Sequence, residues 1–545
     1  MNEKEVSAPV VTHLEAMTSI DSTDPKVRDV TNLDAAARFI VEHGETATEI
    51  TAEESAAVRR KIDKRLMPLM AIMYLNQQLD KSAISFSSVF NFQKDTGLHG
   101  TQFAWLSTIV YIGALIGQPL AVYALARLPV GYYVSANYVA WSICMLCMTA
   151  CTSFTGLAAL RFLLGLFEAS IAPTMMIVTA MWWTRREQGF RSQWWYLQNG
   201  FSSIFGSLLT YGLGHIDNSV LKPYQRIFLA IGLISFCCSI PNALLFPNSP
   251  VTAKFLNENE KRIALERVRY NQTGVQGQHF KWEHVREVAL DPKTYLLIGI
   301  ILPKAITAGG LGTFGPLVLQ GLGYNQFQTT LFNMIPGAIQ IVFGFFAGWW
   351  MTKYKYKSPM LMLLVVISLA GSIGMYISPR GEQYRPQLLA FYMLLQFSGS
   401  AAPLVFAWAN TNTAGSTKKA TIASVEWTFV CIGNAIGPQL FAHDVGPYYF
   451  IALRSQVISL SVIILCVVAM ATWLHMLNKR NARRRAARGA SENLVDLSLE
   501  AESKWAELRE KQLEFNTTAG TTTQIGEQAF LDLTDLENDT FIYSF

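Results

Sequence analysis

The feature that most constrains this chain is a series of long apolar runs. A hydrocarbon core about 30 Å thick is crossed by roughly 20 mostly apolar residues in a helix, and about twelve such runs, each bounded by polar clusters, occur here. A polar stretch at 247–292 divides them into two sets. Because lipid offers no hydrogen bonds to the backbone, each run has to be helical. The sequence therefore predicts an all-α membrane protein with twelve transmembrane helices in two pseudo-symmetric six-helix bundles.

The expected helices of the two bundles are bounded by polar or basic residues at each end. They cover 66–89, 102–125, 131–152, 155–182, 194–214 and 227–246 in the first bundle, and 295–319, 329–350, 359–377, 388–409, 422–441 and 450–474 in the second. The corresponding division of the chain is an N-terminal tail at 1–65, a bundle at 66–246, a linker at 247–292, a bundle at 293–475 and a C-terminal tail at 476–545. Apolar residues at helical spacing predict a surface helix at 491–515.

Lysine and arginine indicate the orientation, because short basic loops resist translocation. Basic residues precede the first run at 59–65, occur in the linker, and follow the last run at 479–488. Both tails and the linker are therefore predicted to be cytosolic, and the plasma membrane is the expected location. Residues 1–54 are polar and acidic, without the apolar core of a cleavable signal peptide. The glycosylation pattern at Asn271 lies in the linker, so we expect it to be unmodified.

Composition and motifs exclude several classes of protein. The chain has 51% hydrophobic and 15% charged residues, and its net charge of +5 over 545 residues is too small to indicate nucleic-acid binding. All seven cysteines lie in apolar runs, and Cys144 and Cys147 have no His or second Cys pair nearby, so no metal site is predicted. The chain has no glycine-rich phosphate loop, metal-ligand array or nucleophile elbow. We expect no cofactor and no enzymatic activity.

Ionisable residues inside the predicted helices are the candidates for function, because each costs several kcal/mol unless it meets water or a partner. Arg161 and Glu168 are seven residues apart, close to two helical turns, so both project from nearly one face. Arg161 stays charged and matches a carboxylate with its planar fork, whereas Glu168 can gain or lose a proton. One cavity containing both would suit a proton-coupled anion carrier. The alternative is that both residues only tie their helix to its neighbours.

Other candidates lie in the first, seventh and eleventh predicted helices. Gln77 and Lys81 belong to a polar run that is too polar to face lipid, so they are predicted to line a cavity; the alternative for Lys81 is a structural pairing with Asp80. Lys304 precedes a glycine cluster that permits bending or close approach, and it either binds a ligand or snorkels. Glu426 is interpreted as a carboxylate at the start of its helix, near the cytosolic interface.

Several motifs in order resemble the major facilitator superfamily, and specifically the fungal anion:cation symporters of the allantoate permease branch. They are LDKS at 79–82, RFLLGLFEASIAP at 161–173, NQTG at 271–274 followed by FKW at 280–282, NTAGSTKK at 412–419 and GNAIGPQLF at 433–441. The resemblance extends over nearly all of 66–473. It implies two bundles that rock about a midplane site, and uptake of a small carboxylate or related anion, such as allantoate, ureidosuccinate or a vitamin, usually with protons.

The resemblance also implies roles for single residues. In related organic-anion carriers, basic positions of the first, fourth and seventh helices and an acid in the fourth line the pathway, which here are Lys81, Arg161, Lys304 and Glu168. The first-helix position is often Arg in the family, and a lysine recognises carboxylate with less directionality. The loop after the second helix, Arg127 to Gly131, lacks the usual set of charges, so the family's cytoplasmic charge latch is incomplete here.

The sequence therefore predicts a monomeric secondary transporter whose partners are a small organic anion, protons and the lipid bilayer. An exporter or uniporter of a different compound is the first alternative, and competition by carboxylates would distinguish it. A nutrient receptor that signals without transport is the second. A membrane enzyme is the third, and no catalytic constellation supports it.

Overall fold

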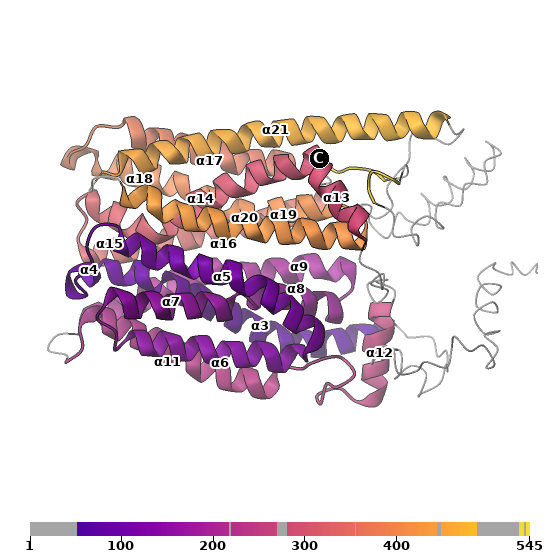
Figure 1. Cartoon of the computed structure of the whole chain (residues 1–545), viewed down its shortest axis with the longest axis horizontal. Coiled ribbons are helices and arrows are strands. Elements are labelled where there is room, and N and C mark those ends of the chain that lie inside the picture. The colour runs from indigo at the N-terminus through magenta and orange to yellow at the C-terminus, as the bar shows by residue number, and fades with distance from the viewer. Residues whose placement is uncertain are drawn as a thin grey trace, which may run out of the picture.

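The computed structural model describes residues 52–216, 220–269, 281–354, 356–443, 448–487, 534–538 and 541–545. In these ranges every regular element is a helix, so the predicted all-α class is confirmed. Two groups of helices lie side by side along the long axis of the molecule (Figure 1). The glycosylation pattern at 271–273, the expected surface helix at 491–515 and residues 1–51 of the N-terminal tail lie outside the described residues.

The first group of helices corresponds to the predicted N-terminal bundle. It consists of α3 (Ala52–Ser88), α4 (Phe92–Asp95), α5 (Gln102–Arg127), α6 (Val130–Met148), α7 (Phe154–Glu168), α8 (Ile171–Trp182), α9 (Arg185–Tyr196), α10 (Gln198–Gly214) and α11 (Pro223–Leu245). The helix α3 begins at Ala52, well before the first predicted span. The span predicted at 155–182 is divided into α7 and α8 at Ala169 and Ser170. Pro173 explains part of this break, because it has no N–H for the carbonyl of Ala169.

The second group corresponds to the predicted C-terminal bundle. It consists of α14 (Pro292–Gly321), α15 (Gln326–Phe332), α16 (Met334–Lys353), α17 (Ser358–Ile377), η2 (Glu382–Tyr384), α18 (Arg385–Leu395), η3 (Gln396–Ala401), α19 (Ala402–Thr411), α20 (Ser416–Ala442) and α21 (Phe450–Ala487). Two short helices, α12 (Glu258–Arg269) and α13 (Trp282–Leu290), belong to the linker. The helix α12 lies against the first group and α13 against the second (Figure 1).

Nine helices among the described residues are long and apolar enough to cross a membrane. They cover Gln102–Leu125, Phe154–Trp182, Pro223–Leu245, Pro292–Gly321, Gln326–Met351, Ser358–Ile377, Glu382–Thr411, Thr417–Ala442 and Phe450–Ala487. The other three predicted spans correspond to α3, α6 and α10. The helix α10 has only 17 residues, and α3 contains the polar run around Lys81. All three predicted spans are helical, but they are too short or too polar to be counted among the nine.

Glycines let some helices touch through their backbones. A Cβ on Gly165 would lie 2.0 Å from the carbonyl oxygen of Val110, and one on Gly113 would lie 2.3 Å from that of Phe162, so α5 and α7 are in direct contact. In α16, by contrast, Gly344 and Gly348 face side chains of the first group, so these glycines allow contact between the two groups.

The two ends of the molecule differ. The start of α3, the end of α21, α12 and α13 all lie at one end, here called the linker end (Figure 1). Toward the opposite end, hydrogen bonds join the two bundles: the Ser85 hydroxyl donates to the Thr313 carbonyl (3.1 Å), and the Gln320 amide donates to the Val89 carbonyl (3.0 Å). Thr108 likewise donates to the Ala435 carbonyl at 2.8 Å.

Candidate functional site

A cavity of about 390 Å³ lies between the bundles, with walls from both. The cavity lining includes all four side chains predicted to bind substrate, Gln77, Lys81, Arg161 and Lys304. Lys81 and Arg161 belong to the first bundle and Lys304 to the second. Among the described residues that line the cavity, these three are the charged ones, and none is Asp or Glu. The cavity is therefore electropositive, and it lies between two bundles that could move apart.

The helix α3 presents two polar faces with different neighbours. Gln77 and Lys81, one turn apart, face the cavity. Asp80 points into the first bundle, where its carboxylate accepts hydrogen bonds from Trp141 Nε1 (2.7 Å) and Ser235 Oγ (3.1 Å). Because a buried carboxylate needs such donors, Asp80 holds α3 to α6 and α11. The alternative in which Lys81 pairs with Asp80 is not what the structure shows.

Lys81 pairs with Glu168 instead. Its Nζ lies 3.5 Å from Glu168 Oε2, and 27% of the lysine side chain but only 2% of the glutamate side chain is exposed. Gln77 Nε2 donates to the Glu168 carbonyl at 3.4 Å. Glu168 is the last residue of α7, so these contacts join α3 to the break between α7 and α8. Glu168 is not part of the cavity lining, and its carboxylate contacts the lining through the ion pair with Lys81.

Arg161 and Lys304 are the cavity cations for which the described residues provide no carboxylate within ion-pair distance. Arg161 is buried, and its Nε and Nη2 have no hydrogen-bond partner among the described residues. An unpaired guanidinium is costly in a buried position, so an anion that reaches these covered donors would be bound favourably. Lys304 lies half-buried on α14, at the opposite wall. Together the three side chains could bind a carboxylate from both bundles at once.

The structure corrects the interpretation of Glu426. The helix α20 begins at Ser416, so Glu426 lies ten residues inside it and not at its start. The side chain is buried, with no hydrogen-bond partner for Oε1 among the described residues. The prediction was wrong because the basic sequence before 422 continues the helix and does not precede it.

Sequence reasoning also missed polar and aromatic parts of the wall. Tyr111 and Asn434 line the cavity, as do Phe406 and Trp427, whose rings are stacked with centroids 5.6 Å apart. Aromatic residues in apolar helices give no signal that separates cavity from lipid. The glycine cluster after Lys304 serves close approach: a Cβ on Gly309 would lie 2.7 Å from Asn434.

Comparisons with known proteins agree with this architecture. Residues 67–438 match the model of the Major Facilitator Superfamily. An uncharacterized transporter of Schizosaccharomyces pombe is 35% identical over 434 residues, covering 79% of this chain and 82% of its own. The allantoate permease of Saccharomyces cerevisiae is 27% identical and covers 100% of this chain and 96% of its own. A bacterial homolog of the human lysosomal transporter Spinster, in an inward-facing and occupied conformation, has the same fold, with a TM-score of 0.56 and 12% identity over 75% of this chain and 96% of that one. The chain therefore belongs to the Major Facilitator Superfamily and is a multi-pass membrane transporter.

Proposed function

We propose that this transporter imports a small organic anion together with protons, by alternating access, and that it belongs to the allantoate permease branch. The observation that carries the proposal is the cavity with three cations and no lining carboxylate among the described residues. Such a cavity attracts anions and repels cations. Arg161 would bind a carboxylate with its planar fork, while Lys81 and Lys304 would supply point charges from the two bundles.

The contact between Lys81 and Glu168 supports coupling to protons. An ionised Glu168 competes with the substrate for Lys81, because both carboxylates need the same ammonium group. A proton on Glu168 removes its charge and frees Lys81 for the substrate. Proton and anion would therefore favour each other's binding, which is a coupling free energy between two sites. The 3.5 Å contact between Lys81 Nζ and Glu168 Oε2 is the observation that supports this competition.

Two further observations support the assignment to the allantoate permease branch and the orientation of the protein in the membrane. The chain and the allantoate permease of Saccharomyces cerevisiae align over nearly the full length of both. The start of α3, the end of α21 and the two linker helices share one end of the molecule (Figure 1), as expected if all of them are cytosolic. In this proposal the linker end faces the cytosol of a cell whose plasma membrane contains the protein.

Uptake into proteoliposomes tests the proposal. Purified protein would be offered a panel of radiolabelled small carboxylates, allantoate and ureidosuccinate among them, at external pH values from 5 to 8. We expect uptake of at least one anion to rise as the external pH falls. Glu168→Gln should abolish this pH dependence, and Lys304→Met should weaken uptake.

Matched variants serve as controls. Glu382→Gln removes an exposed carboxylate, and Lys94→Met removes an exposed ammonium group; both lie in connections away from the cavity. Neither should alter the pH profile. Uptake that ignores pH in the wild type and in Glu168→Gln would refute proton coupling, and transport of cations in preference to carboxylates would refute the anion cavity.

A further inference from the structure

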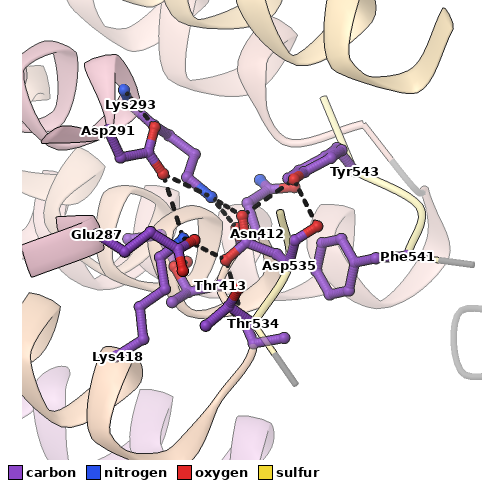
Figure 2. A network of polar contacts seen from close by, with 12 residues as sticks. Glu287, Asp291, Lys293, Asn412, Thr413, Lys418, Thr534, Asp535, Phe541 and Tyr543 are labelled. Carbon is purple, nitrogen blue, oxygen red and sulfur yellow. Dashed lines mark hydrogen bonds and ion pairs between the residues drawn. The ribbon is translucent and has the colours of Figure 1, made fainter. Parts of the chain in front are cut away.

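The segments 534–538 and 541–545 pack against the linker end of the second bundle. Asp535 is fully buried there, between two lysines from different helices (Figure 2). Its carboxylate forms ion pairs with Lys293 of α14 and with Lys418 of α20, the latter at 2.8 Å. The backbone N–H of Ala414 also donates to this carboxylate at 3.3 Å. Donors from three places thus converge on one carboxylate.

The bundle itself holds these lysines in position. Lys418 Nζ donates to Glu287 of α13 at 2.7 Å and lies 3.3 Å from Asp291. Lys293 Nζ donates to the Asn412 carbonyl at 2.7 Å. Because their other partners come from the linker helix and the loop before α20, the lysines belong to a site that the bundle builds and that Asp535 completes.

The residues at 541–545 are bound through their backbone. Asn478 of α21 donates to the carbonyl of Tyr543 and accepts from its N–H, both at 2.9 Å. Asn412 does the same for Ser544, at 2.8 and 2.7 Å. Main-chain hydrogen bonds give affinity for an extended peptide whatever its side chains are, and here two side-chain amides provide them.

Tyr543 joins the two parts of the segment. Its hydroxyl donates to the Asp535 carboxylate at 3.0 Å (Figure 2), and the centroid of its ring lies 5.1 Å from Lys293 Nζ. Trp408 Nε1 donates to the adjacent carbonyl of Ser544 at 2.9 Å. The second bundle therefore recognises three features of the segment: one acid, one aromatic ring and the backbone.

We infer that the linker end of the second bundle is a peptide-binding site for a buried carboxylate and a tyrosine, and that its ligand is the chain's own segment that contains residues 534–538 and 541–545. Residues 488–533 separate this segment from the last helix, so the segment docks as a tethered ligand. Docking is therefore intramolecular and does not depend on the concentration of free peptide. The bound segment connects α14, α20 and α21 with the linker helix α13. Two of these helices carry Lys304 and Asn434, so docking fixes the end of the cavity wall.

The test cuts the tether after folding. A specific protease site placed between residues 490 and 530 of the full chain allows the purified protein to be cleaved, and the fraction of the C-terminal fragment that stays with the membrane part after dilution is then measured. The variants are the wild type, Asp535→Asn and Glu537→Gln. The last removes the same charge from an exposed side chain whose hydrogen bond, to the N–H of Thr534, lies within the segment.

We expect the wild-type and Glu537→Gln fragments to be retained and the Asp535→Asn fragment to be released. A second measurement adds synthetic 534–545 peptides to the cleaved wild type, to displace its fragment. The Asp535→Asn peptide should need at least about tenfold more than the wild-type peptide, because charge-assisted hydrogen bonds are lost. Release of all three fragments alike, or equal competition by peptides with and without Asp535, would overturn the inference. Neither result depends on which substrate is transported.

Discussion

Removing either partner of the Lys81–Glu168 pair should have unequal consequences for stability. Lys81→Gln leaves a glutamate that is 2% exposed and has no hydrogen-bond partner for either oxygen among the described residues. Glu168→Gln leaves a lysine that still reaches the water of the cavity. Because an unpaired buried charge costs more than a solvated one, we expect Lys81→Gln to be the more destabilising change at pH 8.

The separation of the two groups sets the magnitude. At 3.5 Å, the Coulomb energy is about 5 kcal/mol for an effective dielectric constant of about 20 and about 1 kcal/mol in water. The partial exposure of Lys81 to the cavity places the pair between these limits. We therefore expect a coupling energy of about 1–3 kcal/mol in a double-mutant cycle.

The assay is the free energy of unfolding in mixed micelles for the wild type, Lys81→Gln, Glu168→Gln and the double variant. At pH 5 the penalty of Lys81→Gln should shrink, because Glu168 can take up a proton and become neutral. Effects of the single changes that add within about 0.5 kcal/mol at pH 8 would show that the pair does not interact, and the coupling scheme would fail with it.

Two further predictions concern packing and the docked segment. Gly165→Ala should lower the free energy of unfolding by about 1–3 kcal/mol, because its Cβ would overlap the Val110 carbonyl. As a control, Gly312→Ala should be neutral or stabilising, because a Cβ there meets nothing within 4 Å. Equal effects of the two substitutions on the free energy of unfolding would contradict the contact between α5 and α7. Although burial raises the pKa of Asp535, Lys293 and Lys418 outweigh it and hold that pKa below the ordinary aspartate value. The contribution of Asp535 to docking should therefore be complete above about pH 5 and be lost only as the pH falls below about 4. A peptide affinity that declines between pH 7 and pH 5 would argue against Asp535 as the anchor.

The sequence predicted which charged residues lie at the cavity because the physical cost of such residues in lipid is local. Lys81, Arg161 and Lys304 each had to meet water or a partner, and helical periodicity placed Gln77 on the face of Lys81. Periodicity could not separate this face from the adjacent one, where Asp80 bonds to Trp141 and Ser235, 61 and 155 residues away. Only the packing of three helices decides which polar face is inside the bundle.

The docked segment had no signal in the sequence at all. Asp535 lies 242 residues from Lys293, and nothing about a single acid in a polar tail indicates a buried partner. Lys418, which the sequence singles out only as part of the motif at 412–419, is fully buried in an ion-pair network. Counting basic residues in loops gives topology, but it gives no information on which of them form a site.

The hydrogen bonds that hold the bundles together toward the end opposite the linker come from hydroxyl and amide groups, as with Ser85, Thr108 and Gln320. Dissolved ions screen charges but have little effect on such uncharged donors. Raising the ionic strength should therefore leave these contacts between the bundles largely unchanged, while the attraction of Lys81, Arg161 and Lys304 for an anion weakens. Salt should therefore weaken the binding of an anionic substrate without weakening the hydrogen bonds between the two bundles.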